Sequence, residues 1–177
     1  MKSNSIKRLC VIAVVAALYT AVSLALAPLT FGNVQIRIAE ALTLLPVLFF
    51  DSVNALVLGC ALTNLLGAMM GVNVLGFLDV LFGTMATFLA ALLTWKLRNI
   101  KCFNYPILSA CMPVLFNGII IGAELSFALF PLSQFFLGWL ICGIEVALGE
   151  IAACFILGFP LIKALEKKDF VKRFGLH

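Results

Sequence analysis

The sequence predicts an all-α integral membrane protein: a bundle of six transmembrane helices with both termini in the cytoplasm. Hydrophobic residues occupy 64% of the 177 positions and charged residues only 11%. Soluble domains carry about 25% charged residues, so this chain lacks the polar surface that a water-soluble protein of its size needs. At roughly 20 residues per helical span, its length allows about six spans joined by short loops.

Charged residues, prolines and glycines divide the chain into the expected spans. The first apolar stretch ends before Pro28, and proline and glycine mark residues 28–36 as a loop. The second span is short and contains Pro46, and Asp51 is expected to cap the helix that follows it. The expected helices of this single transmembrane domain, residues 1–177, cover about 8–27, 37–50, 53–70, 74–96, 105–125 and 133–162.

The apolar runs are continuous, which indicates helices and not the alternating strands of a membrane β-barrel. Lysines and arginines then predict the orientation, because they concentrate in cytoplasmic loops. With the N-terminus inside, eleven of the twelve basic residues lie on the cytoplasmic side. The exception is Arg37, at the outer start of the second span.

Several kinds of chemistry have no sequence signal here. The six cysteines include no CxxC pair, and the single histidine is the final residue, His177. No GxxxxGK[ST] phosphate loop is present, so any ATP-driven step requires another subunit. We therefore expect no metal site, no cofactor, no catalytic residue and no nucleic-acid partner, and an intramembrane enzyme is disfavoured.

Ionisable groups inside a membrane are costly and are functional candidates by default. Asn117 lies seven residues before Glu124, on the same helical face. Glu145 lies about twelve residues into the last span, roughly 18 Å deep, and Glu150 is deeper still. Candidate solute contacts between mid-membrane and the outer surface are Arg37, Glu40, Asn64, Asp79, Asn117 and Glu145. Their shared depth predicts a solute site open to the outside.

The excess of acidic over basic residues in this region predicts the chemical class of the ligand. One base in this region faces four acids, which are Glu40, Asp79, Glu124 and Glu145. A ligand that is cationic or rich in N–H donors would partner them through charge-assisted bonds. Trp139, six residues before Glu145, is a candidate for stacking on a flat ring. Other roles stay open: Arg37 and Glu40 as a pair on one helix, Glu124 as a solvated helix end, and Trp139 as an interfacial residue.

The first span also offers a candidate surface for a membrane partner. Ala13, Ala17 and Ala21 recur at every fourth position. Small residues at this spacing let a second helix approach closely. Alanine is common in apolar helices, so ordinary packing is the alternative explanation.

Residues 31–46 read Phe-Gly-Asn-Val-Gln-Ile-Arg-Ile-Ala-Glu-Ala-Leu-Thr-Leu-Leu-Pro. This stretch resembles the signature of the QueT family, the substrate-binding (S) components of energy-coupling factor (ECF) transporters for queuosine precursors such as 7-deazaguanines and queuine. Phe31 and Ala39 stand where the family pattern more often has Tyr and Ser. At these two positions the side-chain contacts of the loop therefore need not follow the family pattern.

The resemblance implies an S component in a bacterial plasma membrane, which captures a queuosine precursor from outside under its first loop. Residues 31–40 would form the lid and outer wall, and the six candidate contacts above would bind the solute. The alanine face of the first span would dock on a transmembrane coupling protein driven by two ATPase subunits. The alternative is a stand-alone, proton-coupled secondary transporter of a small cationic or heterocyclic solute, with Asp79, Glu145 or Glu150 carrying protons.

Overall fold

The computed structural model describes residues 2–32, 35–174 and 176, and these form helices and no β-strand. Five helical segments are long and apolar enough to cross a membrane, which confirms the all-α membrane class. The sixth span and the cytoplasmic position of the termini stay predictions.

In chain order, the first elements are α1 (Lys2–Ala25), α2 (Ala27–Thr30), η1 (Ile38–Val47), α3 (Ser52–Met69) and α4 (Leu78–Leu97). They are followed by α5 (Ile107–Leu129), η2 (Leu132–Gln134), α6 (Phe135–Ile151), η3 (Ala152–Gly158), α7 (Phe159–Lys167) and α8 (Phe170–Phe174).

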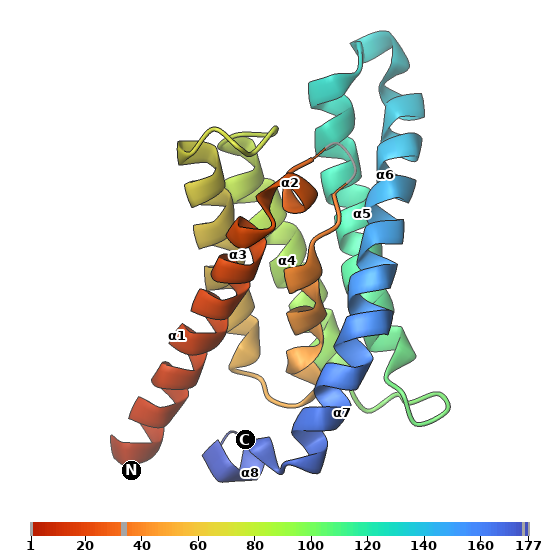
Figure 1. Cartoon of the computed structure of the whole chain (residues 1–177). Coiled ribbons are helices and arrows are strands. Elements are labelled where there is room, and N and C mark those ends of the chain that lie inside the picture. Colours follow the sequence, from red (N-terminus) through yellow and green to blue (C-terminus); the bar gives the residue numbers. More distant parts are fainter. Residues whose placement is uncertain (1, 33–34, 175, 177) are drawn as a thin grey trace.

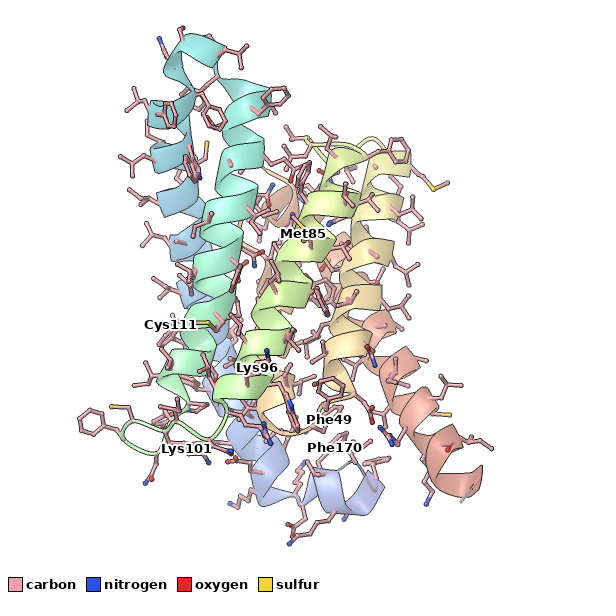
Figure 2. All side chains as sticks on the ribbon, turned by 180° about the vertical axis from the view of Figure 1, so that it is seen from behind. Phe49, Met85, Lys96, Lys101, Cys111 and Phe170 are labelled. Carbon is pink, nitrogen blue, oxygen red and sulfur yellow. The ribbon has the colours of Figure 1, made fainter. Side chains whose placement is uncertain are left out.

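The long helices run side by side, and both chain termini lie at the same end of the bundle (Figure 1). Lys96 and Lys101 lie near this end (Figure 2), which we call the basic end. The opposite end carries α2, the α3–α4 loop and the tip of the α5–α6 hairpin, which projects beyond the other helices (Figure 1). Because the termini share an end with Lys96 and Lys101, the topology is compatible with the orientation predicted from the basic residues.

The second apolar segment differs from the expected span of residues 37–50. It is η1, a ten-residue 3₁₀-helix containing Pro46. At about 2.0 Å per residue it is roughly 20 Å long, shorter than the ~30 Å hydrocarbon core of a bilayer. Every residue from Ala39 to Pro46 is buried, and η1 contacts α1, α3, α4, α5, η3 and α7. A helix that is apolar on all sides is stable only when it is enclosed, so η1 is the centre of the bundle and brings Arg37 and Glu40 with it.

The last span is longer than the expected 133–162. It is a continuous helical segment, Leu132–Lys167, whose middle section η3 is a π-helix. Such segments are rare and often lie at functional sites. Beyond it, α8 folds back beneath the bundle. The ring of Phe170 packs against Phe49 with centroids 6.3 Å apart (Figure 2).

Asp51 does not cap α3 as expected, because its side chain makes no capping hydrogen bond. Instead, both of its oxygens accept hydrogen bonds of 2.6 Å from Arg8. This bidentate ion pair joins α1 to the start of α3 at the basic end. The Ser52 hydroxyl donates to the Phe49 carbonyl at 2.6 Å, which stabilises the turn before α3.

Candidate functional site

A buried ion pair joins the start of η1 to the start of α4. Nη2 of Arg37 donates to Oδ2 of Asp79 at 2.8 Å, and the two side chains are 4% and 0% exposed. Nε of Arg37 donates to Oε1 of Gln35 at 3.1 Å, and Nδ2 of Asn73 donates to the same Asp79 oxygen at 3.0 Å. Arg37 therefore pairs with Asp79, 42 positions away, and not with Glu40 on its own helix.

Asn64 of α3 extends this first network. Its side-chain amide donates to the backbone carbonyl of Asp79 at 2.8 Å and lies 3.5 Å from the Cys60 sulfur. Both Asn64 and Asp79 are fully buried. Gly83 makes room for them, since a Cβ at this position would collide with Asp79 Oδ1 and Asn64 Nδ2. We call the contacts of Arg37, Asp79, Asn64, Gln35 and Asn73 the Asp79 network.

Glu40 belongs to a second network, deeper in the bundle. Its Oε1 accepts a hydrogen bond from the hydroxyl of Tyr19 on α1. The backbone carbonyl of Glu40 accepts hydrogen bonds from the Thr43 hydroxyl and, at 3.6 Å, from the Cys154 thiol. Glu40 is 0% exposed, so a carboxyl group lies at the centre of the bundle with one side-chain partner.

Glu150 completes the second network from α6. Its Oε1 accepts a hydrogen bond of 2.8 Å from Nδ2 of Asn117 on α5. Its Oε2 lies 4.0 Å from the Cys154 sulfur, which also contacts the Glu40 carbonyl. We call the contacts of Tyr19, Glu40, Cys154, Glu150 and Asn117 the Glu40 network.

Acids outnumber bases around the two networks. Arg37 is the only buried basic residue in the described part of the chain. The carboxyl groups buried near it come from four different helices and are Glu40, Asp79, Glu124 and Glu150. Burying a charge is expensive unless it is paired and hydrogen-bonded. One guanidinium, already bound to Asp79, does not balance four carboxyl groups.

Many buried polar atoms here have no hydrogen-bond partner among the residues that the structure describes. Six are acceptor oxygens: Glu40 Oε2, Asn64 Oδ1, Asp79 Oδ1, Asn117 Oδ1 and both carboxyl oxygens of Glu124. One is a donor, the Gln35 side-chain amide nitrogen, and the hydroxyls of Thr63 and Thr84 can serve either way. Buried polar groups in proteins are almost always paired, so this concentration of unpaired acceptors calls for a donor-rich partner.

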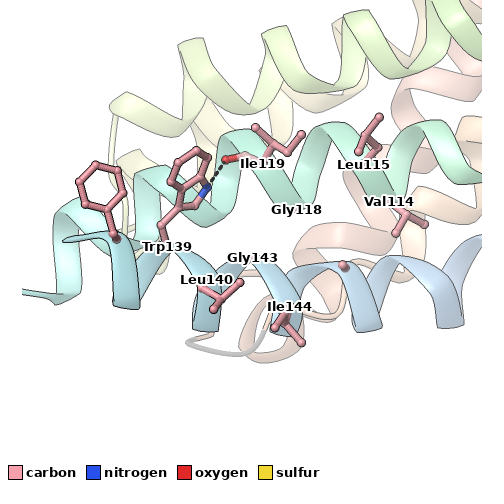
Figure 3. A pocket seen from close by; sticks show the side chains of 10 residues that line it. Val114, Leu115, Gly118, Ile119, Trp139, Leu140, Gly143 and Ile144 are labelled. Carbon is pink, nitrogen blue, oxygen red and sulfur yellow. Dashed lines mark hydrogen bonds between the residues drawn. The ribbon is translucent and has the colours of Figure 1, made fainter. Parts of the chain in front are cut away.

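Two predicted site residues, Trp139 and Glu145, join neither network within the described ranges. The indole nitrogen of Trp139 donates to the Ile119 carbonyl of α5 at 2.9 Å (Figure 3). Its ring lines an apolar groove of about 580 Å³ between α5 and α6. Glu145 is half-buried and lies one turn before Gly149, where a Cβ would come within 2.5 Å of the Gln35 carbonyl. Glu145 is therefore on the side of α6 that borders the first loop.

Four polar residues of the networks were outside the predicted set. Gln35 and Asn73 are amides of the outer loops, and their individual partners, Arg37 and Asp79, became visible only in the folded chain. Glu150 was assigned to a deeper level, and only the packing of α5 on α6 brings it to Asn117. Tyr19 did have a signal, because it is one of only two tyrosines in the chain and lies in an apolar span. Buried tyrosines usually hydrogen-bond through their hydroxyl.

The predicted partner surface is on the outside of α1. Ala13, Ala17 and Ala21 are all exposed, whereas Ala16 is buried. Only 22% of the residues in the apolar window of α1 are buried, against 33% to 50% in the other four long segments. Of those five, α1 is therefore the least covered by the rest of the chain.

Comparison with known protein families decides the identity of the chain. The profile of the QueT transporter family matches residues 9–167 of the 177. The chain belongs to the QueT transporter family. Membership of this family and the five long apolar segments make it a multi-pass protein of the cell membrane with a function in transport.

The match to the QueT transporter family covers every residue of both networks. A search of curated proteins found no match. A search of solved structures found none either. Within the described residues, no group of three or more His, Cys, Asp or Glu side chains is arranged to hold a metal ion.

Proposed function

We propose that this QueT family member is the substrate-binding component of an ECF-type importer. In this role it captures a queuosine precursor, a 7-deazaguanine or queuine, from outside the cell. Separate subunits, a transmembrane coupling protein and two ATPases, then drive uptake. The proposal assigns the opposite end of the bundle to the exterior, which puts Asp79, near the start of α4, close to the outer surface.

The observation that carries the proposal is the excess of unpaired buried acceptors over donors. Within residues 2–32, 35–174 and 176, six acceptor oxygens and a single amide donor lack partners. A ligand that satisfies them must present mainly hydrogen-bond donors. The ring N–H and the exocyclic amine of a guanine-like edge are two adjacent donors, which a carboxylate accepts in parallel. A 7-deazaguanine adds a pyrrole N–H, so the ligand class is rich in the groups that the protein lacks.

The proposed contacts are the predicted residues that belong to the two networks: Arg37, Glu40, Asn64, Asp79 and Asn117. Glu145 is proposed as a contact from the side of the first loop. Trp139 is left out, because its indole donates to the Ile119 carbonyl and lines an apolar groove between α5 and α6. Glu150 is added, because its polar side-chain partners among the described residues are limited to Asn117 and the thiol of Cys154.

Titration calorimetry on the purified chain tests the substrate class. We expect 7-deazaguanine to bind and adenine, whose Watson–Crick edge carries a different donor pattern, to bind at least roughly tenfold more weakly. Glu40→Gln should weaken binding by roughly tenfold or more, because it replaces one oxygen of a fully buried carboxyl group with an N–H donor. Glu166→Gln is the matched control, since Glu166 is 45% exposed at the basic end. Equal affinity for both purines would contradict the proposal.

The partner side of the proposal is supported by the exposed alanines of α1. Small side chains let a second membrane helix pack closely on this face. Ala17→Trp should abolish co-purification with the coupling protein and ATPases while solute affinity stays unchanged. Ala16→Trp is not a suitable control because Ala16 is 2% exposed. Leu115→Trp, on the exposed face of α5, is suitable, and it should leave the complex intact.

A second candidate function is a stand-alone proton-coupled transporter. The buried acids Glu40 and Glu150 favour it, because neither has a basic partner among the described residues and both lie in the bundle centre. Reconstituting the chain alone in liposomes separates the two functions. Uptake driven by a proton gradient, without any ATPase subunit, would support the transporter and exclude the requirement for a coupling module.

A further inference from the structure

Glu124 on α5 is a buried carboxyl group that belongs to neither network. It is 8% exposed and lies five residues before the end of the helix at Leu129. Neither of its oxygens has a hydrogen-bond partner in the described part of the chain. Leaving a buried acceptor unpaired costs about 1–3 kcal/mol and more for a charged group, so a carboxyl group with both oxygens unpaired needs a function.

The surroundings of Glu124 show which way its carboxyl group faces. On one side, its side chain lines an apolar groove of about 550 Å³ between α4 and α5, together with Leu78, Phe82 and Met85. Both carboxyl oxygens are themselves buried, so the groove is lined by the methylene groups of Glu124. Leu78 and Phe82 lie one position before and three positions after Asp79 in α4. Glu124 therefore lies beside the start of α4, which carries Asp79.

No donor of the Asp79 network satisfies Glu124. Arg37 directs Nη2 to Asp79 and Nε to Gln35, and the Asn73 amide also donates to Asp79. Asp79 itself keeps Oδ1 unpaired. Two oxygens of Glu124 and one of Asp79 thus give three unpaired acceptors on the neighbouring helices α5 and α4.

We propose that Glu124, together with Asp79, binds a protonated primary amine on the transported molecule and thereby selects cationic over neutral substrates. An alkylammonium group has three N–H donors and no acceptor, which equals the number of free oxygens here. Its positive charge balances the second carboxylate. The inference rests on the proposed function as a solute-binding component and names Glu124 as the residue that determines charge selectivity.

A pair of ligands that differ in one group tests this inference. The first is 7-deazaguanine with an aminomethyl group on its five-membered ring, and the second has a hydroxymethyl group there. Affinities are measured by titration calorimetry with the full chain in nanodiscs. The wild-type protein should prefer the aminomethyl compound by roughly 10- to 100-fold, the range of a charge-assisted hydrogen bond. Glu124→Gln should remove this preference and change the affinity for the hydroxymethyl compound by less than about threefold.

Two further variants keep the test decisive. Glu166→Gln removes an exposed acid at the basic end and should retain the full preference. Glu124→Asp keeps the charge on a shorter side chain and should retain a preference of about fivefold even if Glu124→Gln folds poorly.

Failure of this inference is distinguishable from failure of the proposed function. If the wild-type protein binds both compounds equally, or Glu124→Gln keeps the preference, the role of Glu124 is overturned while the substrate class stands. If neither compound binds, the substrate class fails, and the role of Glu124 fails with it.

Discussion

The buried pair of Arg37 and Asp79 leads to a prediction about stability. Asp79→Asn keeps the shape of the side chain but removes the negative charge opposite a guanidinium that is 4% exposed. Breaking a buried ion pair by removing one partner destabilises proteins by about 3–5 kcal/mol. For a chain of this length, 1 kcal/mol shifts the midpoint of thermal unfolding by roughly 2–4 °C. We therefore expect Asp79→Asn to lower the midpoint by about 6–20 °C.

The assay is thermal unfolding in detergent, followed by tryptophan fluorescence. The exposed pair Lys101–Glu166, 3.8 Å apart, is the matched control, and Glu166→Gln should shift the midpoint by less than about 4 °C. Combining Asp79→Asn with Arg37→Gln should cost less than the sum of the single changes, because the two groups interact directly. A shift below about 2 °C for Asp79→Asn, or strict additivity, would refute the reasoning.

Three further predictions concern the surroundings of the networks. Tyr19→Phe removes the hydroxyl that donates to Glu40, and thermal unfolding should detect a loss of about 1–3 kcal/mol; an unchanged midpoint would mean that another donor replaces it. Gly149→Val places a Cβ within 2.5 Å of the Gln35 carbonyl, so it should displace the first loop and weaken solute binding in calorimetry. Glu145→Gln should weaken solute binding strongly without preventing folding, and unchanged affinity would remove Glu145 from the proposed contacts.

Which polar residues lie within apolar segments was predictable, because this depends only on position in the chain. The sequence therefore singled out Glu40, Asn64, Asp79 and Asn117 as polar groups inside the membrane, and all four are buried. The direction in which each side chain points from its helix was not predictable in the same way. Trp139 is on the same helix as Glu150, yet its indole is directed to α5 and lines a different surface.

The hydrogen-bond and ion-pair partners of individual side chains were the least predictable feature. Sequence spacing suggested Arg37 with Glu40, because side chains three positions apart are neighbours on an α-helix. Instead, Arg37 bonds to Asp79, which follows it by 42 positions. At the basic end, Asp51 pairs with Arg8 from 43 positions earlier instead of capping its own helix. Both pairs depend on which helices are adjacent, and this is decided by packing across the bundle.

The sequence by itself determined that the chain is helical, lies in a membrane and belongs to the QueT transporter family. Composition and apolar run length set the first two properties, since they sum over local segments and require no knowledge of neighbours. Tertiary structure alone decided that the short second segment is a buried central helix, and that the guanidinium at its start pairs with Asp79 of α4. Electrostatic and hydrogen-bond partners are short-range in space but long-range in sequence, so only packing reveals them.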